Sequence, residues 1–332
     1  MYAAAIPFGG GVSPRFTRRL KGQSIIEYVL IIAVIGLVIV FAGPGVAGAI
    51  RNQFNLVGNT VENGTSGGTE GGASGGGAGG ADSATVQAAV AKDAKDWTLD
   101  EQKAVAEDIA TKGEASPAYA KAKAAMDAGT EFSMKLTDGQ TLTYRIIGMN
   151  HDDLADGSGK AGLTFLTTSR GIQSRMNAAG TNAGGWEKSE LRQKMNSGEI
   201  WNLMPSDFQS KVKSVTKLTN NSNSYSSAAD IVTATSDKLF LLSFFEIVGP
   251  LYDMESKFPW VVNEGTQYED FKSKVSTFNS SNSCLSNGGQ WWQRSMPEHW
   301  TISFYAVTGD GNPSGVGNTA AQSNYVCPAW CF

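Results

Sequence analysis

The sequence holds few of the residues on which most enzymatic and metal sites depend. It has two histidines, His151 and His299, and three cysteines, Cys284, Cys327 and Cys331. So few imidazoles and thiols leave little material for histidine-based catalysis or for a zinc site. The chain also lacks a Ser-His-Asp order, an HExxH motif and a phosphate-binding loop. We therefore expect a protein that is not an enzyme and that binds neither a cofactor nor a metal ion.

The sequence also lacks an excess of basic over acidic residues. The 27 lysines and arginines are outnumbered by 31 aspartates and glutamates, which gives a formal net charge of −4. The last two-thirds of the chain contain no lysine or arginine cluster, so we expect no nucleic-acid partner. The one basic concentration lies within residues 15–21, directly before a long apolar run.

That apolar run extends from Ile25 to Ala42 and is interrupted by a single charge, Glu27. As a helix it would be about 27 Å long, close to the thickness of the bilayer core. The basic residues before it predict that the N-terminus stays in the cytoplasm and that the rest of the chain lies outside. We expect one transmembrane helix in the inner (cytoplasmic) membrane. The carboxylate costs on the order of 2–3 kcal/mol there, so its presence needs a reason.

The motif around this glutamate resembles the class III leader of type IV pilins, most closely that of the Flp/Tad group. Gly22, Gln23, Glu27 and Tyr28 carry the resemblance, together with the basic flank and the apolar run. The resemblance implies that a prepilin peptidase cuts after Gly22 and that the mature chain begins at Gln23. In a filament, Glu27 could then pair with the free α-amine of Gln23 in a neighbouring subunit, because a buried carboxylate is tolerable when it is paired. The alternative is a plain N-terminal signal anchor.

The rest of the chain divides by composition. A Gly-rich stretch cannot bury enough apolar surface to fold and is expected to be a flexible tether. Beyond it the sequence predicts an α+β architecture, with short helices followed by an irregular mixed α/β domain. The predicted segments are 1–22 (leader), 23–57 (transmembrane and assembly helix), 58–82 (linker), 83–129 (helical segment) and 130–332 (C-terminal globular domain).

Local signals specify several elements. Thr98 and Glu101 have the spacing of a capping box, and Ser116-Pro117 predicts a second helix start. From Phe132 the apolar period becomes two, and Asp138-Gly139 between the two runs predicts a β-hairpin. A helix is expected over 187–195, a buried strand or helix over 238–248, and strands over 301–309 and at the C-terminal end.

The C-terminal region resembles a bacterial domain of unknown function found in secreted and phage-encoded proteins. The residues that carry this resemblance lie in 184–192, 237–243, 291–295 and 327–330. The late WW-x-R-S and V-x-P-A stretches are also similar to C-type-lectin-like folds of the formylglycine-generating-enzyme kind. Those enzymes use paired cysteines for copper-dependent oxidation, so the second resemblance implies Cys327 and Cys331 as a candidate pair and a surface enzyme as a third possible function.

Trp291, Trp292 and Arg294 are the candidate ligand-binding residues of this domain. Tryptophans on Gly/Asn/Ser-rich loops could form an aromatic platform for a glycan or a peptide, although burial in the core is the simpler interpretation. For Arg294 and Arg192, buried bidentate pairing with acids such as Glu187 or Glu246 is the favoured interpretation.

The cysteines fit an oxidising compartment and a disulfide, with Cys284–Cys327, Cys284–Cys331 and Cys327–Cys331 all open. Acidic residues at 152, 153 and 156 resemble a calcium loop in their spacing alone, and a solvated hairpin loop is the better interpretation.

Together these features predict a pilin-like structural and adhesive subunit of a Flp/Tad-type pilus. It would display a C-terminal binding domain at the cell surface, with prepilin peptidase, other pilin subunits, the membrane before assembly, and an unknown glycan or protein ligand as partners. The alternative is a membrane-anchored surface binding protein that never enters a filament.

Overall fold

A computed structural model describes residues 83–221, 232–251 and 253–332. The leader, the transmembrane helix and the linker predicted for residues 1–82 lie outside the described residues. The described residues all belong to one compact unit. Within them, none of the helices has both the length and the apolar character needed to span a bilayer. They form a mixed α+β domain with short helices and several sheets, as the sequence predicts.

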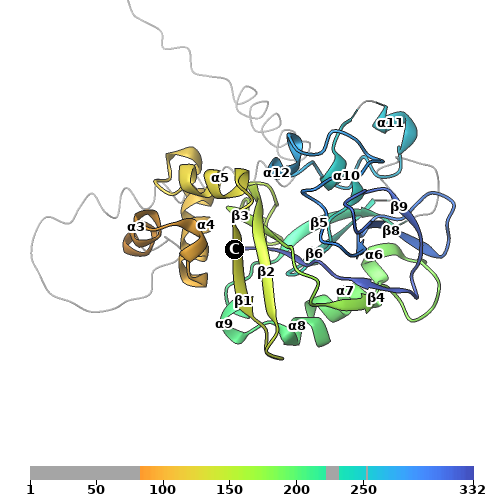
Figure 1. The fold of residues 1–332 in the computed structure, drawn as a ribbon, viewed down its shortest axis with the longest axis horizontal. Coiled ribbons are helices and arrows are strands. Elements are labelled where there is room, and N and C mark those ends of the chain that lie inside the picture. The colour runs from red at the N-terminus through yellow and green to blue at the C-terminus, as the bar shows by residue number, and fades with distance from the viewer. Residues whose placement is uncertain (1–82, 222–231, 252) are drawn as a thin grey trace, which may run out of the picture. The chain divides into compact units, whose positions relative to one another are not determined.

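The N-terminal part of this unit is helical, in agreement with the Ala-rich composition of 83–129 (Figure 1). It contains α3 (Ser83–Ala91), η1 (Ala94–Asp96), α4 (Leu99–Lys112), η2 (Gly113–Ala115) and α5 (Tyr119–Asp127). Both bonds of the predicted capping box are present, since the Thr98 hydroxyl accepts from the backbone N–H of Glu101 and the Glu101 carboxylate accepts from that of Thr98. The predicted start of α5 at Ser116-Pro117 is wrong. The Ser116 hydroxyl accepts from the backbone N–H of Ala118, which makes a turn, and the helix begins at Tyr119.

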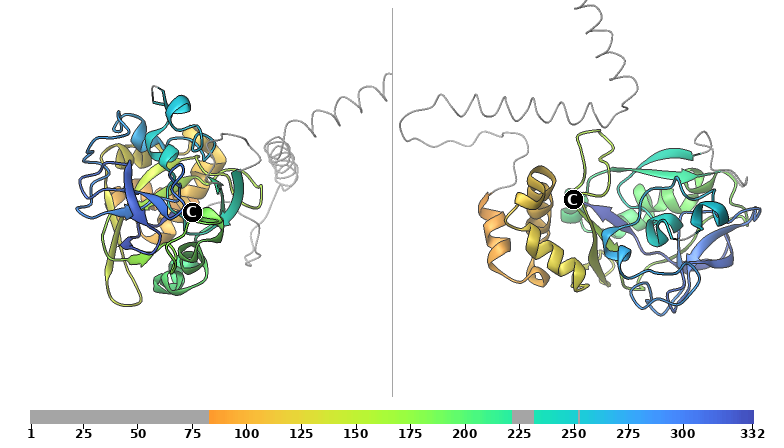
Figure 2. Two further views of the ribbon diagram at one scale, coloured as in Figure 1. Left: turned by 90° about the vertical axis from the view of Figure 1, so that its right-hand side faces the viewer. Right: turned by 90° about the horizontal axis from the view of Figure 1, so that it is seen from above.

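A four-stranded antiparallel sheet follows, in the order β1 (Glu131–Lys135), β2 (Thr141–Met149), β3 (Leu163–Thr167) and β11 (Ala329–Cys331). The predicted hairpin is confirmed, and Gly139 in its turn has a φ of 88°, which favours glycine. The predicted closing strand is confirmed as well, because β11 pairs with β3 and forms the edge of the sheet opposite β1. Figure 2 shows α3–α5 on one side of this sheet and most of the chain after β3 on the other.

Two further sheets complete the unit. A five-stranded sheet has the order β4 (Gln173–Arg175), β10 (Ser323–Tyr325), β7 (Trp291–Trp292), β8 (Ser303–Val307) and β9 (Gly315–Thr319). A two-stranded antiparallel ribbon consists of β5 (Val215–Asn220) and β6 (Val232–Asp237). The strand predicted over 301–309 is therefore present as β8.

Short helices connect these strands: α6 (Gly185–Lys188), α7 (Glu190–Asn196), α8 (Glu199–Leu203), α9 (Ser206–Gln209), α10 (Phe244–Val248), α11 (Met254–Lys257) and α12 (Glu269–Lys272). The helix predicted over 187–195 is split at Ser189, whose hydroxyl accepts from the backbone N–H of Arg192 and so caps α7. The buried segment 238–248 combines an extended part, where Phe240 bridges to Ala329, with helix α10.

Aromatic side chains fill the core. Trp330 of β11 stacks on Phe165 with ring centroids 5.8 Å apart and meets Phe208 edge-on at 5.1 Å. Trp186 and Trp292 are fully buried. Burial of each such ring removes well over 100 Å² of surface from water, so these contacts are a main source of stability.

Helix α4 approaches β3 so closely that a glycine is required between them. A Cβ built on Gly162 would lie 1.8 Å from the backbone oxygen of Ala106 in α4. Even alanine at this position must therefore push the helix away from the sheet.

We predict that Gly162→Ala lowers the free energy of unfolding by at least about 1–3 kcal/mol, because overpacking forces backbone shifts. Thermal denaturation measures the change. Gly180→Ala is the matched control, since a Cβ there would meet nothing within 4 Å. Equal melting temperatures for the two variants would contradict the close helix–sheet contact.

Candidate functional site

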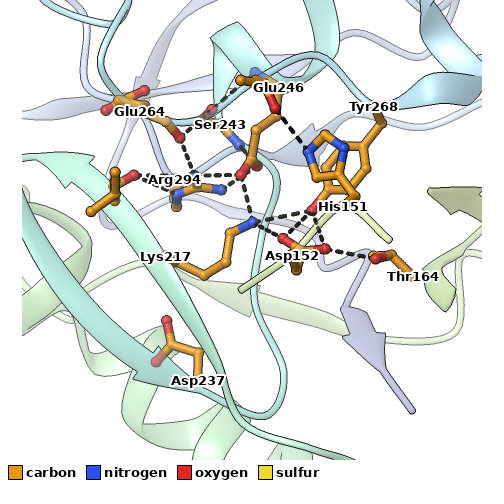
Figure 3. Close-up of polar contacts among 12 residues, drawn as sticks. His151, Asp152, Thr164, Lys217, Asp237, Ser243, Glu246, Glu264, Tyr268 and Arg294 are labelled. Atoms are coloured by element: carbon orange, nitrogen blue, oxygen red, sulfur yellow. Dashed lines mark hydrogen bonds and ion pairs between the residues drawn. The ribbon is translucent and has the colours of Figure 1, made fainter. Parts of the chain in front are cut away.

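Five charged side chains are buried together at the centre of the unit. They are Asp152, Lys217, Glu246, Glu264 and Arg294, and each is at most 4% exposed (Figure 3). Burial of a single ionised group is costly unless it is paired and hydrogen-bonded. This charge cluster is therefore the most unusual chemical feature of the described residues and the candidate site.

Backbone register places Asp152 opposite Lys217. Leu154 bridges to Val215 of β5 in antiparallel fashion, and the backbone N–H of Thr216 donates to the Asp153 oxygen at 2.8 Å. The same register brings Asp152 and Lys217 face to face, with Lys217 Nζ 2.6 Å from Asp152 Oδ1.

Glu246 forms ion pairs with both cations of the cluster, Lys217 and Arg294. It occupies the third position of α10, where its carboxylate accepts from the backbone N–H of Ser243 in a second capping box. Its Oε1 lies 2.5 Å from Lys217 Nζ. Arg294 holds the same carboxylate in a bidentate pair, at 2.5 Å from Nη1 to Oε2 and 2.8 Å from Nη2 to Oε1. The predicted structural pairing of Arg294 with Glu246 is confirmed.

Glu264 completes the cluster as a third carboxyl group. Its Oε1 accepts from the backbone N–H of Asn220 at 3.1 Å, and its Oε2 accepts from the Ser295 hydroxyl. The neighbouring Gly265 has a φ of 131°, and a Cβ there would lie 2.9 Å from Glu246 Oε1. The glycine thus lets this loop pass directly over the Glu246 carboxylate.

The three carboxyl groups have different pKa values because their surroundings differ. Burial would raise the pKa of Asp152, but the positive charge of Lys217 and the hydrogen bonds from Lys217 and Thr164 act against it and, with the other charges around it, lower this pKa. Burial likewise opposes ionisation of Glu246, and the charge of Arg294 keeps its pKa low. For Glu264 burial prevails and raises the pKa to about 7. Protonation of Glu264 leaves two anions facing two cations, which is a neutral cluster.

Aromatic and hydroxyl groups enclose the Asp152–Lys217 pair. Lys217 Nζ lies 4.4 Å from the ring centroid of Phe240 and 5.5 Å from that of Tyr268. The Tyr268 hydroxyl lies 3.0 Å from Asp152 Oδ1, and the Thr164 hydroxyl donates to Asp152 Oδ2 at 2.6 Å. Every polar atom around the pair therefore has a partner.

A second constellation lies beside the cluster. His151 Nδ1 lies 3.2 Å from Glu269 Oε2, and Nε2 lies 3.3 Å from the Thr266 hydroxyl. The order hydroxyl, imidazole, carboxylate is the one that nucleophilic catalysis uses. However, the His151 ring stacks on Tyr268 with centroids 4.0 Å apart, and its side chain is 6% exposed. The ring is thus held in place by packing, which leaves little room for a substrate.

The candidate ligand-binding residues Trp291, Trp292 and Arg294 are all buried, at 2%, 0% and 0% exposure. The indole N–H groups of the two tryptophans donate to the backbone oxygens of Leu285 and Ser174. This is the core arrangement, so these side chains do not form a surface platform.

Arg192 also forms a structural pair, but with another acid than the sequence suggested. Its Nε donates to Asp237 Oδ1 at 2.6 Å, while Trp186 donates to Asp237 Oδ2 at 2.9 Å. Glu187 offers Arg192 a backbone oxygen only. Asp237 lies apart from the charge cluster (Figure 3). Its hydrogen bonds connect the segments 184–192 and 237–243, which both carried the family resemblance.

All three cysteines are free thiols in the structure. Cys284 and Cys327 line one cavity of about 30 Å³ together with Asn287, which donates to Cys327 Sγ at 3.4 Å. Cys331 Sγ instead lies 3.4 Å from the Thr164 hydroxyl beside Asp152. Burial raises the pKa of Cys284, and it raises that of Cys327 to about 12.

The acidic loop after β2 does not gather its carboxylates. Asp152 belongs to the charge cluster, Asp153 pairs with Lys160 at 3.0 Å, and Asp156 accepts from the backbone N–H of Ser158. Among the described residues, no group of three or more His, Cys, Asp or Glu side chains is placed to hold a metal ion.

Sequence reasoning missed Asp152, Lys217 and Glu264 as members of one site. One signal was available, because Val215, Lys217 and Thr219 alternate along β5 and all three are buried. A lysine in the inward register of a strand requires a buried acid, but the sequence does not identify which one.

The Glu264 pKa predicts how stability changes with pH. Its pKa is about 7 in the folded protein and near the ordinary 4.5 after unfolding. Its contribution is therefore fully present below about pH 4.5 and is lost as pH rises through 7, by at most about 3 kcal/mol. Asp152 and Glu246, whose folded pKa values are lowered, act in the opposite sense, and their contribution is lost at low pH. From these three groups we expect maximal stability near pH 4.5–5.

Chemical denaturation from pH 4 to 9 measures this profile, and Glu264→Gln is the matched variant because it keeps the shape of the side chain. The variant should lose the decline between about pH 5 and 8 that burial of Glu264 causes. An unchanged decline in the variant would show that another group causes it.

The shared cavity makes Cys284–Cys327 the expected pair if a disulfide forms on oxidation. Peptide mapping of the non-reduced chain, isolated from its own cells, identifies the pair. Cys331→Ser should leave the link intact, whereas Cys284→Ser should abolish it. A link that contains Cys331 would contradict this pairing.

A comparison with known protein families finds a match, and it covers the part of the chain that contains most of the charge cluster. A family model described as a domain of unknown function (DUF6273) matches residues 161–331, and these contain every member of the charge cluster except Asp152. No curated protein and no solved structure matches the chain. Because the family model matches more than half of the sequence, the chain belongs to the DUF6273 family.

Proposed function

We propose that this protein is a pilin-like subunit that displays its DUF6273 domain at the cell surface as a non-enzymatic binding module. One observation carries the proposal, the motif in which Gly22 is followed by Glu27-Tyr28, with basic residues before it and an apolar run after it. Prepilin peptidase would release the mature chain at Gln23. Glu27 and the new α-amine would then pair between subunits of a Flp/Tad-type filament.

The chemistry of the domain supports binding rather than catalysis. The charge cluster is buried and internally paired, and the imidazole of His151 is packed against Tyr268. The large apolar side chains that are exposed lie elsewhere, and two of them, Trp300 and Ile302, share one loop at 47% and 45% exposure. Asn182 fixes this loop by donating to the backbone oxygens of Trp300 and Ser303. A rigidly held, exposed tryptophan is a common anchor for protein and glycan ligands.

Electron microscopy with a label on the C-terminal domain tests this function. Label along or at the end of thin surface filaments is the expected result. Label spread over the cell body without filaments would instead favour a membrane-anchored surface binding protein that is not incorporated in a pilus.

We predict that the mature chain begins at Gln23 and that Glu27→Gln is inserted and cleaved normally but assembles poorly. The substitution removes the carboxylate that would pair with the α-amine of the next subunit, while it keeps the side-chain shape. N-terminal sequencing and the yield of sheared filaments measure the two steps. A mature chain that begins at Met1 or after Ala49 would rule out the leader, and normal filament yield would rule out the pairing.

A further inference from the structure

We propose that Lys217 and Asp152 become joined by an intramolecular amide bond between Lys217 Nζ and Asp152 Cγ. The two groups already meet, with Nζ 2.6 Å from Asp152 Oδ1 and both side chains at most 3% exposed. Reacting groups held this closely have effective concentrations of about 10⁵–10⁸ M in well-oriented systems. The bond would link β5 to the segment that follows β2.

The backbone fixes the approach of the two groups. Leu154 bridges to Val215, and this register puts Asp152 directly across from Lys217. The two side chains point toward each other (Figure 3).

Glu246 is placed to carry a proton during the reaction. Its Oε1 lies 2.5 Å from Lys217 Nζ, on a carboxylate that Arg294 holds in a fixed orientation. A carboxylate in contact with the attacking nitrogen can take a proton from it and return the proton to the leaving oxygen. Glu246 would thus be the catalytic residue.

Two hydroxyl groups lie next to Asp152 Oδ2, the oxygen that remains in the amide. The Thr164 hydroxyl donates to Asp152 Oδ2 at 2.6 Å, and the Tyr268 hydroxyl lies 3.1 Å from the same oxygen. Negative charge develops on this oxygen in a tetrahedral intermediate, and fixed donors in a site without water stabilise such charge strongly.

The steps balance without an oxidant or reductant. A proton first passes from Lys217 Nζ to Asp152 Oδ1, which gives a neutral amine beside a carboxylic acid. Nζ then attacks Cγ, and Glu246 moves a second proton from the nitrogen to Oδ1. The Cγ–Oδ1 bond breaks, one water leaves and the amide remains. Two buried ions are replaced by a neutral group, which removes their desolvation cost. The Glu246–Arg294 pair keeps the site neutral.

The burial of this pair distinguishes it from other lysine–carboxylate pairs among the described residues. In each pair that lacks Lys217, at least one side chain is more than a quarter exposed. The Lys274–Asp270 pair comes closest, with the lysine 27% exposed and the acid fully buried. Water reaches the Lys274 ammonium group, so that pair is the internal control.

Intact mass spectrometry of the purified full chain under denaturing, reducing conditions tests the proposal. The expected mass is lower than that of the mature sequence by one water molecule, and peptide mapping should find Lys217 linked to Asp152 and Lys274 unlinked. A full sequence mass with both peptides unlinked would overturn the proposal. The test needs no filament, so it stands apart from the proposed function.

Two variants sharpen the result. Lys217→Arg keeps the positive charge but not the reactive amine, so its mass should be that of its sequence. Asp152→Asn should still react, but with loss of one ammonia instead of one water. Circular dichroism confirms that each variant is folded. Loss of water in Lys217→Arg would assign the mass change to another site and overturn the proposal.

Discussion

The bidentate pair between Glu246 and Arg294 is the interaction on which the rest of the domain depends. Arg294 also donates to the backbone oxygens of Leu241 and Glu264, at 2.7 Å each. One guanidinium therefore joins the buried segment before α10, the loop that contains Gly265 and the strand region around β7. Breaking such a pair by removal of one partner typically costs about 3–5 kcal/mol, since the other charge stays buried and uncompensated. The planar, always-charged fork of arginine suits this position better than lysine would.

Charge neutrality explains why three acids can share this interior with two cations. Lys217 lies between Asp152 and Glu246, and Arg294 covers the far side of Glu246. Glu264 has no cation in direct contact with its carboxyl group among the described residues, and this group accepts from the Ser295 hydroxyl and the backbone N–H of Asn220. Burial therefore raises its pKa to about 7, so the cluster changes charge close to neutral pH while the four inner charges remain fixed.

Sequence reasoning succeeded where the determinants are local or carry a strong chemical signal. The Thr98–Glu101 capping box and the hairpin at Gly139 depend on residues a few positions apart. Arg294 follows the buried strand β7, where an arginine requires an acid. It failed where distant segments meet. Lys217 and Asp152 are separated by 64 other residues and pair through a register that no local pattern specifies. The predicted start of α5 was wrong for a local reason, because the Ser116 hydroxyl closes a turn instead of capping the helix.

Glu246 and Glu27 present the same physical problem in two parts of the chain. Each is a carboxylate placed in an apolar stretch, where an unpaired charge is strongly disfavoured. Glu246 is relieved within its own domain, by Arg294 and Lys217. For Glu27, whose apolar stretch offers no neighbouring cation, we expect relief from a second subunit after cleavage creates an α-amine. An internal pair stabilises one folded chain, whereas a pair that needs a neighbour drives assembly. Under the proposed function, the same chemistry would make the domain self-sufficient, whereas residues 23–57 would depend on a neighbouring subunit.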